Sequence, residues 1–237
     1  MANDLDYLVF VGTYTMGASK GIYIFRLEFS SGKLEQINLA PGVENPSYLE
    51  IHPSGKYLYA VSENDEGLLS SFAIDVKTGG LKLLNQQSSL GNAPCHVSID
   101  QSGRCALITN YESGNICAYT IGANGYLSEA KSNIQHHGKS TDPVRQKGPH
   151  AHSVKIDPYN RFAVVADLGL DQVLVYRLDT ANAKLELNNP SLVQLPGGQG
   201  PRHLDFHPSG KYAYLINEIG NTVSTLKYDA SYGTLSE

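Results

Sequence analysis

The sequence predicts an all-β fold, a β-propeller built from four-stranded antiparallel blades, and three observations lead to this prediction. Four segments resemble one another and recur about every 50 residues, a period typical of propeller blades rather than of helical solenoids. Each copy divides into short runs rich in Val, Ile, Tyr and Thr, separated by turns that contain Pro, Asn or Gly. The apolar residues of the copies do not follow a helical period.

Each of the four copies, which begin at Asn45, Ala93, His150 and Gly200, predicts four strands in the same order. The first strands read SYLEI, CHVSI, HSVKI and RHLDF, and a turn of the type HPSGK or DPYNR follows, with residues that favour a tight reversal. The second strands read YLYAVS, CALIT, FAVVAD and YAYLIN. The third strands read LLSSFAID, NICAYTIG, QVLVYRLD and TVSTLKYD, and the fourth read GLKLL, YLSEA, KLELN and TLSE.

The beginning of the chain predicts an incomplete blade. Residues 7–15, 21–29 and 33–37 read as a second, a third and a fourth strand, without a first strand nearby. In a propeller, the far end of the chain completes such a blade and so removes the open sheet edges. Here the sequence stops on the fourth strand of its last copy, and residues 130–149 interrupt the repeat as a polar loop. We therefore expect residues 1–237 to form a single propeller domain of about five blades, part of a larger ring; a five-bladed ring with one unclosed blade is the alternative.

Charge and cysteine content restrict the function classes. The formal net charge is −5, so the protein lacks the basic field that general nucleic-acid binding requires. The cysteines, Cys95, Cys105 and Cys117, are odd in number and lack CxxC spacing, which argues against a disulfide framework or a zinc site. They are typical of free thiols in a reducing compartment.

The N-terminal residues, MANDLDYLVF, carry acidic side chains where a signal peptide needs positive charge. The sequence also has no apolar run approaching the roughly 20 residues of a membrane helix. We therefore expect a cytoplasmic protein without a membrane partner. The residues make no prediction of an oligomeric state.

One position of the repeat changes its residue type from copy to copy. Early in the first strand it holds Ser47, Cys95, His152 and Arg202. In known propellers the first strand is the innermost, which would bring this position to one mouth of the central channel. A position that only supports the fold would tend to keep one residue type. The variation favours a site assembled from several blades; the alternative is a solvated rim without a function.

A second row of positions lies at the end of each second strand. Glu218 follows Arg202 by sixteen residues, and its equivalents are Glu63, Tyr111 and Leu168. Because adjacent residues of a strand point to opposite faces, either this row or the row one residue earlier faces the site.

Several phrases of the sequence resemble one known family. FVGTYT near the start, the turns HPSGKYLY and HPSGKYAY, GPHAHSV, and GPRH followed by NE are similar to the lactonase family of seven-bladed β-propellers. That family includes propeller-type 6-phosphogluconolactonases and fungal carboxy-muconate cyclases. The resemblance extends from about Leu8 to the last residue. It implies seven blades, so the last two, roughly 100 residues at a period near 50, would be absent here.

The resemblance implies that His152, Arg202 and Glu218 form a catalytic group, with His150 as the alternative histidine. Lactone opening needs a base for water, and a histidine with an ordinary pKa of about 6.5 can serve near neutrality. Arg202 could hold the developing oxyanion or grip a phosphate or carboxylate. Glu218 could orient either partner or act as the base itself. The residues leave the division of these roles open.

The loop before His152 is rich in histidines and cations. Arg145, Lys147 and His150 are the expected substrate-binding residues, and cations beside the site of an acidic protein suit a phosphorylated substrate. The alternative is an ordinary solvated loop. Histidines at positions 136, 137, 150 and 152 raise the idea of a metal, but they lack a defined ligand spacing, so we expect neither a metal nor another cofactor.

The expected function is hydrolysis of a sugar-acid lactone, as the resemblance implies, most simply 6-phosphogluconolactone to 6-phosphogluconate in the pentose phosphate pathway. One alternative is a non-catalytic propeller that binds a protein or a small ligand, because propellers host many unrelated functions. Another is a lactonising enzyme of the muconate cyclase type, because Arg202 and a basic loop suit any polyanion.

Overall fold

The structure, a computed structural model, describes residues 6–237. This part of the chain contains nineteen strands and no helix. A membrane-spanning helix is therefore absent from the described residues. The strands pair into five separate antiparallel sheets, one of three strands and four of four. Within every sheet, strands that are consecutive in the sequence lie side by side, as blades of a propeller require.

The first three sheets contain the N-terminal strands. The first sheet consists of β1 (Asp6–Val11), β2 (Gly21–Glu28) and β3 (Leu34–Pro41). The second consists of β4 (Leu49–Ile51), β5 (Tyr57–Ser62), β6 (Leu68–Ile74) and β7 (Leu81–Ser88). The third consists of β8 (Pro94–Ile99), β9 (Cys105–Asn110), β10 (Asn115–Ile121) and β11 (Leu127–Gln135).

The last two sheets contain the C-terminal strands. The fourth sheet consists of β12 (Ala151–Ile156), β13 (Phe162–Asp167), β14 (Gln172–Asp179) and β15 (Lys184–Gln194). The fifth consists of β16 (Pro201–Phe206), β17 (Tyr212–Asn217), β18 (Thr222–Asp229) and β19 (Thr234–Ser236). The repeat therefore predicted the sheets correctly, including the first sheet, which has three strands within residues 6–237.

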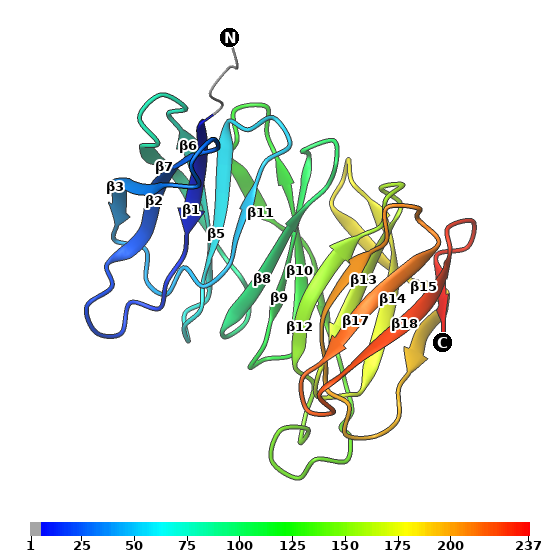
Figure 1. Cartoon of the computed structure of the whole chain (residues 1–237). Helices are drawn as coiled ribbons and strands as arrows, with labels where there is room; N and C mark the ends of the chain where they lie inside the picture. The colour runs from blue at the N-terminus through cyan, green and yellow to red at the C-terminus, as the bar shows by residue number, and fades with distance from the viewer. Residues whose placement is uncertain (1–5) are drawn as a thin grey trace.

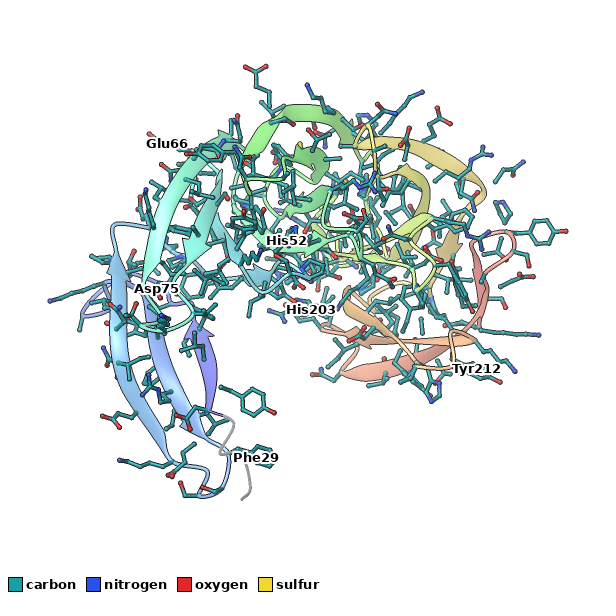
Figure 2. The ribbon with its side chains drawn as sticks, turned by 90° about the horizontal axis from the view of Figure 1, so that it is seen from above. Phe29, His52, Glu66, Asp75, His203 and Tyr212 are labelled. Carbon is teal, nitrogen blue, oxygen red and sulfur yellow. The ribbon has the colours of Figure 1, made fainter. Side chains whose placement is uncertain are left out.

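The five sheets stand next to one another in chain order (Figure 1). Seen from above they follow an arc, with the first sheet at one end, the fifth at the other, and His203 on the inner side (Figure 2). The arc of antiparallel blades confirms the predicted β-propeller architecture.

The hydrophobic core lies between neighbouring sheets. Because strand side chains alternate between two faces, one strand supplies two core layers. On β13, Ala163 and Val165 pack toward the third sheet, whereas Phe162, Val164 and Ala166 pack toward the fifth. Equivalent apolar layers join the first sheet to the second and the second to the third. This packing holds the innermost strands in a fixed relation to one another.

The turns between first and second strands are stabilised by their own side chains. In the HPSGK turn, Nδ1 of His52 accepts a hydrogen bond from the backbone N–H of Ser54 over 3.1 Å. In the equivalent turn, Oδ1 of Asp100 accepts from the backbone N–H groups of Arg104 and Cys105. His52 and Asp100 therefore stabilise these turns with their own side chains.

Candidate active site

One pocket of ≈ 490 Å³ is lined by residues that lie in, or next to, strands of all five sheets. Its size falls in the range of small-molecule sites. The lining residues come from the ends of the inner strands and from the segment before β12. They are Tyr14, Ser47, Tyr48, Glu63, Cys95, Tyr111, Arg145, His152, Arg202, His203 and Glu218.

A β-bulge in the inner strands of the third, fourth and fifth sheets places a pocket residue outside the regular pairing. In the fifth sheet Pro201 pairs with Asn217 and His203 pairs with Ile216, so Arg202 is an extra residue between two paired positions. His152 in β12 and Cys95 in β8 hold the same place in their strands. A bulge leaves one residue outside the ladder and re-aims its side chain. Three blades thus present Cys95, His152 and Arg202 in the same way.

Glu218 lies directly after β17 and connects the cations of the pocket. Its Oε2 accepts a hydrogen bond from Nε of Arg202 over 2.8 Å, and its Oε1 accepts one from Nη2 of Arg145 over 2.6 Å. Partial burial opposes ionisation of the carboxyl, but the hydrogen bond from Arg145 and the charges of both arginines outweigh it. The pKa of Glu218 is therefore below its ordinary value, and the carboxylate is charged at neutral pH.

His152 faces the same carboxylate from the fourth sheet. Its Nε2 lies 4.0 Å from Oε2 of Glu218, and its side chain is nearly buried. Burial, together with the positive charge of Arg202 and the neighbouring His203, lowers the pKa of His152 to about 4. The imidazole is therefore neutral at pH 7 and able to accept a proton.

Two further histidines stand beside His152. The rings of His152 and His203 are 5.3 Å apart, and those of His203 and His96 are 5.4 Å apart. Burial lowers the pKa of His203 and lowers that of His96 well below the ordinary value. Nδ1 of the buried His96 has no hydrogen-bond partner within residues 6–237. His203, which lines the pocket, and His96 behind it are thus neutral at neutral pH.

Residues next to strands of the first two sheets also line the pocket. Tyr14 donates from its hydroxyl to Oε2 of Glu63 over 2.9 Å. Burial and this hydrogen bond raise the pKa of Tyr14 to about 12, so its hydroxyl keeps its proton. Glu63 and Glu218 therefore line the same pocket from the second and the fifth sheet, one beside a phenol and one beside two guanidinium groups.

The residues singled out from the sequence fall into two groups. His152, Arg202, Glu218 and Arg145 all line the pocket. Lys147 is exposed, and neither it nor His150 is among the described residues that line the pocket. Nδ1 of His150 instead pairs with the carbonyl oxygen of Tyr111 at 2.8 Å, and the two rings stack.

Sequence reasoning missed Tyr14, Tyr48 and His203 as pocket residues. His203 and Tyr48 directly follow the pocket residues Arg202 and Ser47, so strict alternation would turn them away. At Arg202 the bulge cancels that alternation, and both Arg202 and His203 reach the pocket. The tyrosine of FVGTYT was visible only as part of a family phrase.

Within residues 6–237, no group of three or more His, Cys, Asp or Glu side chains is arranged to hold a metal ion. The histidines of the 136–152 region are separated by their own contacts. His136 pairs with Asp167, and His150 pairs with a backbone carbonyl.

Comparison with known proteins gives a consistent assignment. The family described as "Lactonase, 7-bladed beta-propeller" matches residues 8–237. The 6-phosphogluconolactonase of Bacillus subtilis (strain 168) is 35% identical over 232 residues, which cover 98% of this chain and 65% of that protein. The 6-phosphogluconolactonase of Formosa agariphila is 31% identical over 241 residues, which cover 97% of this chain and 68% of that protein. The chain thus spans about two thirds of the length of these relatives.

Solved structures agree with these relatives. The periplasmic gluconolactonase of Pseudomonas aeruginosa superposes with a TM-score of 0.92 at 32% identity, over 98% of this chain and 66% of that one. A proposed 6-phosphogluconolactonase of Bacteroides fragilis NCTC 9343 superposes with a TM-score of 0.93 at 39% identity, over 99% of this chain and 67% of that one.

Proposed function

Because this chain belongs to the lactonase family of seven-bladed β-propellers, we propose that the protein hydrolyses a sugar-acid lactone. The proposed substrate is 6-phosphogluconolactone, which opens to 6-phosphogluconate. The relatives named 6-phosphogluconolactonase support this choice. His152, Arg202 and Glu218 are the proposed catalytic residues, and Arg145 is proposed to bind substrate.

The observation that carries the proposal is the convergence of His152, Arg202 and Glu218 on one pocket. These side chains come from two blades and bring a proton acceptor, a cation and an anion to one pocket, with Glu218 2.8 Å from Nε of Arg202 and 4.0 Å from Nε2 of His152. Those are the groups that ester opening requires: a base for water and a donor for the oxyanion.

His152 is the proposed base. It is neutral at pH 7, because its pKa is lowered to about 4, and its Nε2 faces the pocket side where Glu218 lies. A low pKa weakens a base, but an anionic substrate would offset the positive charge of Arg202 and so raise the pKa of His152 in the complex. His152 would take a proton from water as that water attacks the lactone carbonyl, and would return it to the ring oxygen that leaves.

Arg202 is the proposed oxyanion donor. Its Nε is occupied by Glu218, and its two terminal amino groups make no hydrogen bond to residues 6–237. These N–H groups are available to the carbonyl oxygen as it gains negative charge. Glu218, bound by two guanidinium groups, is assigned to hold Arg202 in place rather than to accept a proton.

The compartment belongs to the same proposal. A phosphorylated sugar lactone is a cytoplasmic metabolite, and the three cysteines are buried free thiols that suit a reducing environment. One structural relative is a periplasmic gluconolactonase. Fractionation of cells that express the full-length protein would decide between the two compartments.

The function is tested with freshly prepared 6-phosphogluconolactone and the full-length protein. Formation of 6-phosphogluconate is followed by its NADP-dependent oxidation, with spontaneous opening subtracted from a blank without protein. We expect a rate well above the blank that is proportional to protein concentration. A rate equal to the blank, with gluconolactone also inert, would favour a binding propeller; turnover of a muconate instead would favour the cyclase alternative.

A further inference from the structure

We propose that the buried pair His136–Asp167 positions the segment between β11 and β12 so that Arg145 binds the phosphoryl group of the substrate. On this view Arg145 is the specificity-determining residue, and His136 and Asp167 are positioning residues that act through it. The inference rests on the proposed lactonase function and names the part of the pocket that distinguishes a phosphorylated lactone from an unphosphorylated one.

Asp167 forms hydrogen bonds with both ends of the segment between β11 and β12. Its Oδ2 lies 2.6 Å from Nδ1 of His136, where the segment begins, and both side chains are almost fully buried. Its Oδ1 accepts a hydrogen bond from the backbone N–H of His150, where the segment ends, over 2.8 Å. Nε2 of His136 also pairs with the hydroxyl of the buried Tyr176 at 3.0 Å. One carboxylate therefore fixes both the point where the segment leaves β11 of the third sheet and the point where it enters β12 of the fourth.

The middle of the segment has its own anchors. The hydroxyl of Ser140 donates to Oδ2 of Asp171 over 2.5 Å. The side chain of Gln146 is buried, and its Nε2 donates to the carbonyl oxygen of Leu168 over 2.8 Å. Both acceptors belong to the fourth sheet's β13–β14 turn, so the segment is bound along its length to one blade.

Arg145 lies in a turn of this segment that is held by hydrogen bonds. Oδ1 of Asp142 accepts from the backbone N–H groups of Val144 and Arg145, each over 2.8 Å. The Arg145 side chain then reaches two other blades: its Nη2 donates to the hydroxyl of Tyr111 over 3.0 Å and to Oε1 of Glu218 over 2.6 Å. A long side chain is thus directed to one place at the rim of the pocket.

The place that Arg145 occupies suits an anion. Arg145 and Arg202 share a single carboxylate, that of Glu218, so two guanidinium groups meet one negative charge there. Nε and Nη1 of Arg145 make no hydrogen bond to residues 6–237, and the side chain is 44% exposed, so it can bind a ligand at the rim. A guanidinium is a strong partner for phosphate oxygens. Lys139 and Lys147 of the same segment are exposed and are not among the described residues that line the pocket. Arg145 is therefore the cation that this segment supplies to the pocket.

The test compares two substrates, 6-phosphogluconolactone and gluconolactone, through the ratio of their kcat/KM values. We expect Arg145→Ala to lower this ratio about 10- to 100-fold, chiefly through the KM of the phosphorylated lactone, since a hydrogen-bonded charge contact is worth about 1.5–3 kcal/mol. Lys139→Ala, which removes a positive charge from the same segment outside the pocket, is the matched control and should keep the wild-type ratio. An unchanged ratio in Arg145→Ala, or an equal loss on both lactones, would overturn the assignment of Arg145.

The positioning role is tested by a double-mutant cycle. His136→Phe removes both hydrogen bonds and should lower the ratio as Arg145→Ala does. His136→Asn, which keeps a donor near the position of Nδ1, should restore part of it. In the Arg145→Ala background, His136→Phe should change the ratio no further; an additional loss would show that His136 does not act through Arg145. Tyr176→Phe, a milder change to the same network, serves if His136→Phe does not fold.

A binding measurement separates this inference from the proposed function. If the wild type opens neither lactone, the lactonase proposal fails, and calorimetric titration with 6-phosphogluconate and gluconate then tests Arg145 alone. We expect the wild type to prefer 6-phosphogluconate and Arg145→Ala to lose that preference. If the wild type binds both acids equally, the phosphoryl assignment is wrong whatever the activity.

Discussion

Nε of Arg202 donates a hydrogen bond to Oε2 of Glu218 over 2.8 Å, and the two residues lie 16 positions apart in one hairpin of the fifth sheet. The contact joins the extra residue of a β-bulge to the residue that follows the neighbouring strand. It leaves the terminal amino groups of the guanidinium without a hydrogen bond to residues 6–237, and Arg202 and His152 line the same pocket. The predictions below begin from this arrangement.

Substitution Arg202→Lys should lower kcat/KM for an anionic lactone by roughly 100-fold or more. Lysine keeps the charge but lacks the fork that lets one nitrogen bind Glu218 while others bind the oxyanion. Initial rates over a range of substrate concentrations measure the effect. Lys211→Ala, a cation in a turn of the same sheet, should leave kcat/KM within about twofold; wild-type turnover by Arg202→Lys would remove Arg202 from the mechanism.

The pH profile of kcat/KM should follow the lowered pKa of His152. The base must be neutral, and its pKa in the free protein is about 4 rather than the ordinary 6.5. Since kcat/KM reports the free enzyme, we expect its acid limb near pH 4, with little loss between pH 7 and pH 5. Initial rates between pH 3.5 and pH 8 test this with gluconolactone, which lacks the phosphate that titrates near pH 6. Half-maximal activity near pH 6.5 would mean that an unperturbed histidine, and not His152 in this environment, is the base.

The three cysteines should be unreactive in the folded protein. All three are buried and free, and burial raises the pKa of Cys95 and of Cys117 to about 12 and that of Cys105 further still. Because the thiolate is the reactive form, an aromatic disulfide reagent at pH 8 should label less than about one thiol per chain before unfolding and all three afterwards. Rapid labelling of one thiol in the native protein would contradict the burial of Cys95 in the pocket wall.

Substitution Ile108→Ala should destabilise the protein by about 2–5 kcal/mol. Ile108 is fully buried in the apolar layer between the second and third sheets, so the shorter side chain leaves a cavity. Denaturant unfolding compares the variant with Val76→Ala, at a position that is 64% exposed and should change stability by less than about 0.5 kcal/mol. Equal effects of the two substitutions would argue against inter-sheet packing as the main source of stability.

The alignment of the repeats predicted which blade positions meet. His152 and Arg202 hold equivalent places, and rotation between blades brings equivalent places together, so their shared pocket followed from the sequence. The bulges did not follow, because a bulge depends on how two strands pair and not on the residues of one strand. For that reason His203, next to Arg202, was not recognised as a pocket residue.

Two further differences have physical reasons. The fourth strands are longer than expected: β7, β11 and β15 continue to Ser88, Gln135 and Gln194. Sequence reasoning ended these strands early because polar residues, and in β15 also Pro190, follow their apolar beginnings. Sequence reasoning also grouped Arg145 with Lys147. Arg145 lines the pocket and Lys147 does not, because long-range contacts such as that of Gln146 with Leu168 fix the path of the segment. No local sequence pattern reveals such contacts.

The most direct test of the account is the rate of 6-phosphogluconate formation by His152→Gln compared with wild type, both as full-length proteins. Glutamine keeps a polar side chain of similar length but cannot act as a base, and general-base help is worth roughly 10²–10⁴-fold. We predict that kcat falls by about 10²-fold or more, while thermal unfolding and the binding of 6-phosphogluconate stay close to those of wild type. A His152→Gln variant that opens the lactone at the wild-type rate would contradict the assignment of this pocket as a lactonase active site with His152 as its base.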